Sequence, residues 1–283
     1  RGVILNSRTG RRRLLERPIA NVSPDGRFAL SVSFARMFDF RPGYGYAGLT
    51  EPTRDDPAPE NDGVFRIDLQ TGKASLILSL AQIAEVLQPW LDQPRKLLVN
   101  HLTVNRDGTR FVMLVRYFPE PGQTWKTAVM TADPDGGGLY PLTDGFAVAS
   151  HYHWKSPDVL LIYADGPAGL QLYEWTDRTP EKRVVDLGYF RSDGHCSFSP
   201  DGRWLLYDSY PDAGRMQHLY LYHLPGKKGM TLGSYYSEKT DIDARCDLHP
   251  RWSPSGRFIS FDSTHEGRRR VYEMDLTAVM NGW

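Results

Sequence analysis

The chain has 283 residues, in which 34 lysines and arginines balance 34 aspartates and glutamates, so its formal net charge at pH 7 is zero. A neutral chain has no overall field that attracts nucleic-acid phosphates or an anionic membrane, and we expect no nucleic-acid partner. No stretch approaches the ~20 apolar residues of a membrane span, so none is expected.

The sequence starts at Arg1 rather than Met and shows no signal-peptide core. This slightly favours a cytoplasmic location, and it leaves open whether the chain is a fragment. Composition is more telling: 26 Gly and 20 Pro accompany 15 Tyr, 12 Phe and 7 Trp. Many turn-forming residues together with many aromatic residues favour an all-β protein. Nothing in the composition indicates the oligomeric state.

A ten-residue pattern recurs along the chain and predicts its architecture. In most copies Pro-Asp-Gly or a similar tripeptide separates two β-rich segments, supplying the fixed φ of Pro and the positive φ of Gly that a tight turn requires. A second hairpin follows each copy, so each repeat is expected to form the four antiparallel strands of one propeller blade. The copies begin at Asn21, Thr103, Ser197 and Arg251, with a degenerate copy at Trp154.

Taken in chain order, residues 2–17 are expected to form the outer hairpin of an earlier blade, and five further blades follow. The long first interval is explained by an insertion at residues 51–93, which contains an acidic, Pro-rich loop and the segment from Ser79 to Gln88. Ser79 and Gln82 form a capping box, and this is the one segment that reads as a good helix. We therefore predict one all-β propeller domain over residues 1–283, with about six blades or a truncated set of seven.

Half of the eight histidines occupy one position of this repeat. They are His101, His151, His195 and His249. The first strand of a blade lines the central channel of a propeller, so these side chains are expected to converge. Imidazole is the commonest metal ligand and titrates near neutral pH, which predicts a metal or proton-transfer site. The alternative is that each histidine only hydrogen-bonds a neighbouring blade.

Two carboxylates stand close to this position. Asp193 and Asp247 each precede a histidine of the set by two residues, which places them on the same face of a strand. They are candidates to orient the imidazoles or to bind the metal directly. Alternatively they cap turns, or they form the acid/base pair of a glycosidase, whose separation the sequence does not fix.

Arginine, tyrosine and histidine side chains suited to acidic sugars lie elsewhere in the chain. Tyrosine rings stack on sugar faces, and arginine holds a carboxylate with two hydrogen bonds. The alternative for each is an ordinary residue of a β-sheet surface. Cys196 and Cys246 are expected to be packing residues. The candidates for substrate binding are Arg41, Tyr44, Tyr46, Tyr210, Arg251 and His265, and Arg116 is a candidate for catalysis.

The Ser-Pro-Asp-Gly repeats resemble the TolB-like propeller superfamily across nearly the whole chain. More specifically, Asp193-Gly-His195-Cys-Ser-Phe-Ser-Pro-Asp-Gly and Cys246-Asp-Leu-His249-Pro-Arg-Trp-Ser-Pro-Ser-Gly resemble the oligogalacturonate lyase family. That resemblance implies a seven-bladed propeller and a manganese ion held by histidines and a glutamine. It further implies that His195 and His249 are metal ligands and that His151 is the base.

The chain departs from the lyase pattern at two ligand positions. Arg251 stands where the family has a second histidine, and Cys246 stands where it has the glutamine. The metal ligands of this chain would then come from the four repeated histidines, with His101 as an additional ligand beside His195 and His249. The segments Arg41-Pro-Gly-Tyr-Gly-Tyr46 and Phe261-Asp-Ser-Thr-His-Glu-Gly-Arg268 resemble instead a separate bacterial branch of the superfamily.

Two functions follow from these patterns. The first is a lyase that cleaves a uronate-containing oligosaccharide by β-elimination, with His151 as base and a divalent metal, manganese by resemblance, at His195 and His249; Arg116 or Arg251 would hold the uronate carboxylate. The second is a propeller without catalytic activity that binds a glycan or a protein partner.

Overall fold

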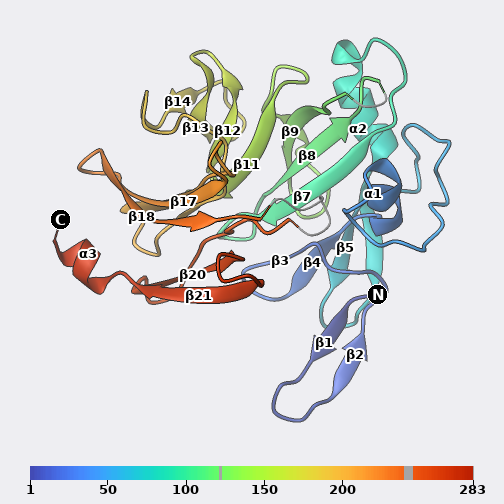
Figure 1. Cartoon of the computed structure of the whole chain (residues 1–283). Coiled ribbons are helices and arrows are strands. Elements are labelled where there is room, and N and C mark those ends of the chain that lie inside the picture. Colours follow the sequence, from blue (N-terminus) through green and yellow to red (C-terminus); the bar gives the residue numbers. More distant parts are fainter. Residues whose placement is uncertain (121–122, 239–244, 283) are drawn as a thin grey trace. The chain divides into compact units, whose positions relative to one another are not determined.

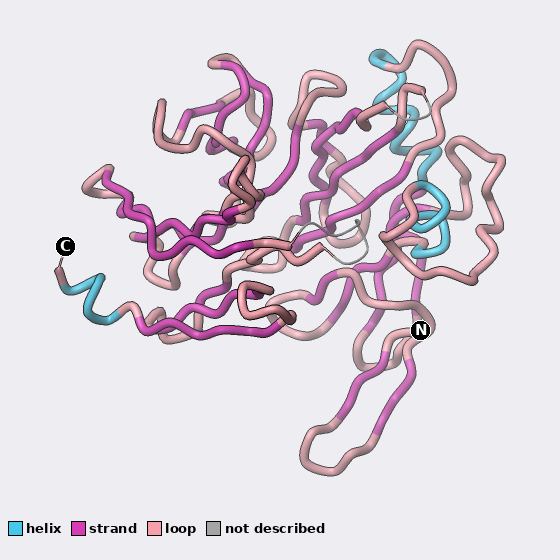
Figure 2. The backbone as a smooth tube through the Cα atoms, in the orientation of Figure 1, coloured by secondary structure: helices cyan, strands magenta, loops and turns pink. Residues whose placement is uncertain are grey.

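The computed structural model describes residues 1–120, 123–238 and 245–282, and strands dominate this part of the chain (Figure 1). Figure 2 shows that loops link the strands and that helices are confined to a few short segments. The described strands form antiparallel sheets, four with four strands, one with three and one with two. The chain divides into two compact units, the first comprising Arg1–Ala149, Ser156–Asp158 and Thr176–Pro180, and the second comprising Ser150–Lys155, Val159–Trp175 and Glu181–Trp283.

The first unit begins with a two-stranded hairpin. Strand β1 (Val3–Leu5) pairs with β2 (Arg12–Leu14), as predicted for residues 2–17, and the hairpin extends away from the next sheet (Figure 1). Behind it Leu15, which is 1% exposed, packs in a small core with Ala29 and Ile67. Burial of Leu15 therefore attaches the hairpin to the following sheet.

The next sheet explains why the repeated tripeptide forms a turn. Ser23 donates a hydrogen bond from Oγ to Asp25 (2.7 Å) and accepts one from the backbone N–H of Phe28 (3.1 Å). Gly26 has φ +68°, a left-handed conformation that residues with a Cβ rarely adopt. The sheet has the order β3 (Asn21–Val22), β4 (Phe28–Ser31), β5 (Gly63–Asp68) and β6 (Ala74–Ser79).

The predicted helix is present, and the expectation that it is the one good helix is wrong. Helix α2 (Leu80–Leu87) has the complete Ser79/Gln82 capping box. A second helix of the first unit, α1 (Phe34–Phe40), is capped by Ser33 and carries Arg36 inward. This arginine is 1% exposed, so tertiary contacts stabilise a segment that periodicity did not single out. Two shorter segments are the 3-10 turn η1 (Gln88–Trp90) and α3 (Thr277–Asn281), which lies in the second unit.

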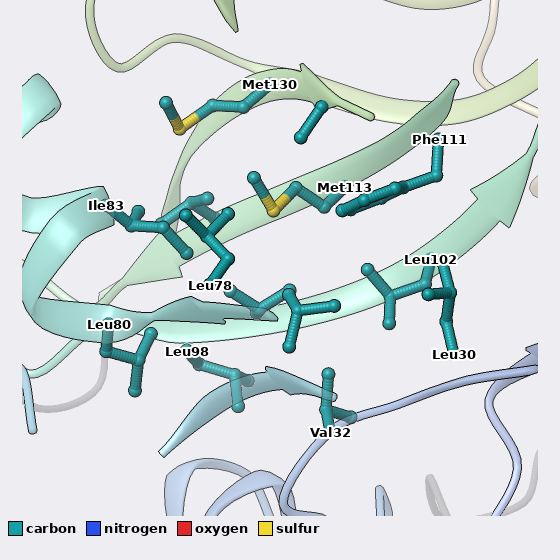
Figure 3. Close-up of a cluster of buried hydrophobic side chains, with 14 of the residues drawn as sticks. Leu30, Val32, Leu78, Leu80, Ile83, Leu98, Leu102, Phe111, Met113 and Met130 are labelled. Atoms are coloured by element: carbon teal, nitrogen blue, oxygen red, sulfur yellow. The ribbon is translucent and has the colours of Figure 1, made fainter. Parts of the chain in front are cut away.

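The third sheet of the first unit packs against α2. Figure 3 shows Ile83 of the helix facing Met113 and other side chains of a shared hydrophobic core, in which Leu98, Phe111 and Met113 are at most 3% exposed. The sheet has the order β7 (Leu98–Val104), β8 (Phe111–Tyr117), β9 (Lys126–Ala132) and β10 (Tyr140–Pro141).

Three sheets follow one another along the chain in the second unit, and only two residues at the ends of their strands, Ala149 and Thr176, are assigned to the first unit. The last of these sheets has three described strands where the repeat predicted four. Trp204, Leu221 and Ile259 are buried in one hydrophobic core of the second unit. The strands are β11 (Ala149–Trp154), β12 (Val159–Gly166), β13 (Gly169–Thr176), β14 (Lys182–Val184), then β15 (Cys196–Phe198), β16 (Trp204–Asp208), β17 (Met216–His223), β18 (Lys228–Tyr236), and finally β19 (Arg251–Trp252), β20 (Phe258–Ser263), β21 (Arg270–Asp275).

The mostly β character and the four-stranded antiparallel sheets are as predicted. The number of blades, the closure of a ring and the single domain over residues 1–283 stay predictions. Among the described residues, no helix has the length and apolar character to cross a membrane.

Candidate metal and proton-transfer site

The structure brings three of the four repeated histidines together in the second unit. The ring of His195 lies between those of His151 and His249, with centroid separations of 4.1 and 4.0 Å. His151 belongs to β11, His195 directly precedes β15, and His249 lies two residues before β19. Three consecutive sheets therefore contribute one imidazole each, as the repeat predicted for these positions.

A buried carboxylate that the sequence analysis did not single out as a site residue holds two of these histidines. Asp208, the last residue of β16, is 1% exposed. It accepts hydrogen bonds from the backbone N–H of His195 (2.6 Å) and of His249 (3.1 Å). Its Oδ2 also lies 3.0 Å from Nδ1 of His195. We assign the proton to Nδ1 on this contact, which leaves Nε2 of His195 as the nitrogen with a free lone pair.

His195, Asp247 and His249 form a group that fits a divalent cation. Each offers one ligand atom, and these atoms lie within 4.8 Å of one another. The Asp247 side chain is buried: Oδ2 pairs with Arg245 at 2.7 Å, whereas Oδ1 has no hydrogen-bond partner among the described residues. A buried oxygen without a partner is costly, and a bound cation would remove that cost. Two imidazoles and a carboxylate match the donors of zinc and manganese sites.

The stacked imidazoles have opposite pKa shifts. Burial opposes protonation of His195, but Asp208 and more distant carboxylates outweigh it and raise the pKa of His195. Desolvation and the adjacent His195 lower the pKa of His249. The site therefore favours a neutral His249, which is the form that binds a metal.

His151 is held between an acceptor and a donor. Its Nδ1 lies 2.9 Å from Oδ1 of Asp193, and its Nε2 lies 3.3 Å from the hydroxyl of Tyr210. Burial, and secondarily Asp193, raises the pKa of Tyr210, so the hydroxyl keeps its proton at neutral pH. Asp193 therefore positions the histidine of the preceding repeat, rather than His195 two residues after it. This pairing leaves Nε2 of His151 as the proton acceptor.

The remaining predicted residues of the second unit have other contacts. Arg251 is exposed and pairs with Asp262 at 3.0 Å. His265 contacts Ser263 through Nδ1 (2.9 Å) and packs against the ring of Tyr272. Cys196 and Cys246 are buried free thiols, and burial raises the pKa of Cys196. Buried thiols of high pKa suit packing better than metal binding.

Five predicted residues belong to the first unit, and three of them contact Trp125, which was not predicted. The guanidinium carbons of Arg41 and Arg116 lie 4.5 and 4.2 Å from the ring centroid of Trp125. Tyr44 contacts both Trp125 and His101, with ring centroids 6.1 and 6.3 Å apart. Sequence reasoning missed Trp125 because it lies outside the repeat. Tyr46 stacks instead on Phe34, at 4.8 Å.

Comparison with solved structures shows the fold. TolB from Acinetobacter baumannii matches with a TM-score of 0.54 and 14% identity over 96% of this chain, which spans only 56% of that protein. Pyrococcus horikoshii acylaminoacyl peptidase matches with a TM-score of 0.58 and 14% identity, over 96% of this chain and 40% of its own. The chain therefore has the TolB-like propeller fold that the repeats predicted.

A structure of oligogalacturonate lyase in complex with manganese is also similar, at 15% identity over 99% of this chain and 97% of that one. Its TM-score of 0.46 is too low to carry an argument about chemistry. No family model matches the sequence, and no curated protein matches it.

Proposed function

We propose that the second unit is a metal-dependent lyase site that cleaves a uronate-containing oligosaccharide by β-elimination. The observation that carries the proposal is the stack of His151, His195 and His249, in which a histidine oriented as a base adjoins a group of metal donors. The uronate as substrate class rests on the sequence resemblance of the segments around His195 and His249.

His195, Asp247 and His249 would hold the cation. The resemblance favours manganese, and the mixed nitrogen and oxygen donors are compatible with it. When bound, a divalent cation stabilises negative charge that develops on a substrate carboxylate. Asp208 acts on this group indirectly, because it holds the ring of His195 and the backbone of His249.

His151 is the proposed base. Its Nε2 removes the proton from the carbon next to the uronate carboxylate, while Asp193 stabilises the imidazolium through Nδ1. The electron pair of that C–H bond forms the new C=C bond, and the glycosidic C–O bond breaks. Tyr210 is placed to protonate the leaving oxygen and to recover a proton from Nε2 of His151, so the protons balance.

A cation for the substrate carboxylate is also present at this site. Arg245 pairs with Asp247 and lies over the ring of Tyr210, at 5.0 Å from its centroid. We assign the carboxylate-binding role to Arg245 rather than to Arg251, because Arg245 pairs with the proposed ligand Asp247, whereas Arg251 pairs with Asp262.

The test uses the purified chain, stripped of metal and reloaded with Mn²⁺, incubated with a panel of oligouronates. The unsaturated product absorbs in the ultraviolet. We expect product from the reloaded protein, none from His151→Ala, and full activity from the control His218→Ala. Absence of product with every oligouronate overturns the lyase, and metal binding without turnover favours a glycan- or protein-binding propeller instead.

A further inference from the structure

The first unit holds a cluster of cations and aromatic rings that contains none of the residues of the proposed metal site. Its centre is the half-buried Trp125, which directly precedes β9. Arg41 lies 4.5 Å from the Trp125 centroid and 4.6 Å from that of Tyr44. An aromatic ring attracts a guanidinium through the cation–π interaction without using its N–H groups as hydrogen-bond donors.

The guanidinium of Arg41 has no acidic partner in the part of the chain that the structure describes. Among these residues it makes neither a hydrogen bond nor an ion pair. The one carboxylate of α1, on Asp39, is already engaged, because it pairs with Arg54 and with Lys96 (2.5 Å). The fork of N–H donors on Arg41 is therefore available to a ligand.

A second positive charge lies against the same indole. Arg116 is 3% exposed, and its guanidinium carbon is 4.2 Å from the Trp125 centroid. It donates from Nε to the hydroxyl of Thr127 at 3.1 Å. Both guanidinium groups lie against the ring of Trp125, so an anion bound beside this ring would be attracted by two positive charges.

We propose that Arg41 and Trp125 form a binding site for an oxyanion, with Arg116 adding positive charge beside it. The fork of Arg41 matches the two coplanar oxygens of a carboxylate or a phosphate. The exposed His101, edge-on to Tyr44, borders the site. This site does not depend on the proposed lyase activity.

The test is a titration of the whole chain, followed by tryptophan fluorescence, with three probes: inorganic phosphate, glucuronate and the neutral sugar glucose. We expect saturable binding of at least one anion and none of glucose. Binding of glucuronate alone identifies a sugar acid as the ligand class, and binding of phosphate alone identifies a phosphate ester. Trp125→Phe should remove the fluorescence change.

Variants of Arg41 distinguish anion binding at this site from nonspecific electrostatic attraction. Arg41→Ala should weaken anion binding at least tenfold, and Arg41→Lys, which keeps the charge but loses the fork, should also weaken it. The matched control is Arg27→Ala, since Arg27 is 85% exposed and its ion pair with Asp25 is long, at 3.5 Å. Thermal unfolding of each variant verifies the fold, and Arg41→Lys serves alone if Arg41→Ala does not fold.

Three results overturn the proposal. The first is absence of saturable binding for both anions. The second is binding by folded Arg41 variants as tight as that of Arg27→Ala. The third is loss of binding in His195→Ala or on addition of a chelator, because the anion would then occupy the histidine site of the second unit. Failure of the lyase assay alone leaves this proposal standing.

Discussion

Nδ1 of His195 lies 3.0 Å from Oδ2 of Asp208, and the same carboxylate accepts a hydrogen bond from the backbone N–H of His249. One buried aspartate thus fixes the ring of one proposed ligand and the backbone of another. Since Asp208 is not itself in the group of metal donors, its removal tests positioning apart from ligation.

Asp208→Asn should weaken binding of a divalent metal about 10–100-fold, the usual cost of losing a carboxylate behind a ligand histidine. Isothermal titration of metal-free protein with Mn²⁺ measures the change. Asp212→Asn is the control, because Asp212 is exposed and contacts His218 outside the site. Equal affinity of Asp208→Asn and wild type would show that Asp208 does not position the ligands.

Asp193→Asn should lower kcat about 10²–10⁴-fold, the range that a positioned acid or base supplies, because Nδ1 of His151 loses its charged partner. Metal affinity should stay unchanged, since His151 is outside the donor group. Steady-state kinetics and metal titration on the same preparation separate the two effects, with the exposed Asp165→Asn as control. A variant that keeps its kcat contradicts the role of Asp193.

Arg36→Met should destabilise the first unit by roughly 3–5 kcal/mol, because it removes the closest cation from the buried Glu51 carboxylate and leaves only Lys96, at 3.9 Å, among the described cations. Arg36 also donates to the carbonyls of Leu97 (2.8 Å) and Pro57 (2.9 Å), so the insertion loop loses its attachment. Urea unfolding measures the loss against Arg54→Met, a side chain that is 64% exposed. Equal losses in both variants would rule out Arg36 as the attachment of the loop.

Glu174→Gln should reduce the acid sensitivity of the second unit. Burial alone would raise the pKa of Glu174, but hydrogen bonds from Lys155 and Arg183 outweigh burial and lower it. A lowered pKa stabilises the fold above the pKa of the unfolded chain, and this contribution is lost as pH falls through the pKa of the folded state.

The free energy of unfolding, measured against pH through the acid range, should therefore fall less steeply in Glu174→Gln than in wild type. The exposed Glu238→Gln serves as control and should follow wild type. Parallel curves for Glu174→Gln and wild type would show that this ion pair does not contribute to acid sensitivity.

The turns and the histidine positions could be predicted because they are local. Ser199 accepts a hydrogen bond from the backbone N–H of Trp204 at 3.0 Å, and Gly202 has φ +70°, so a few neighbouring residues determine that turn. The repeat then showed that the histidines occupy equivalent positions in successive copies, and the structure places His151, His195 and His249 together.

The partners of these histidines could not be predicted in the same way. Asp208 and His249, which are hydrogen-bonded, are 41 residues apart in the sequence, and Asp193 and His151 are 42 residues apart. No local spacing therefore indicates either contact. Helix α1 was missed for a related reason. It is stabilised by Arg36, whose partners lie in the insertion loop and at Leu97.

The most direct test of the central claim is the metal content of the purified chain after equilibrium dialysis against Mn²⁺. The account predicts one tightly bound ion per chain in wild type and in the control double variant His218→Ala/His265→Ala. It predicts loss of that ion in His195→Ala/His249→Ala and in Asp247→Asn. Wild-type protein without metal, or equal metal content in the His195→Ala/His249→Ala variant and wild type, would contradict it.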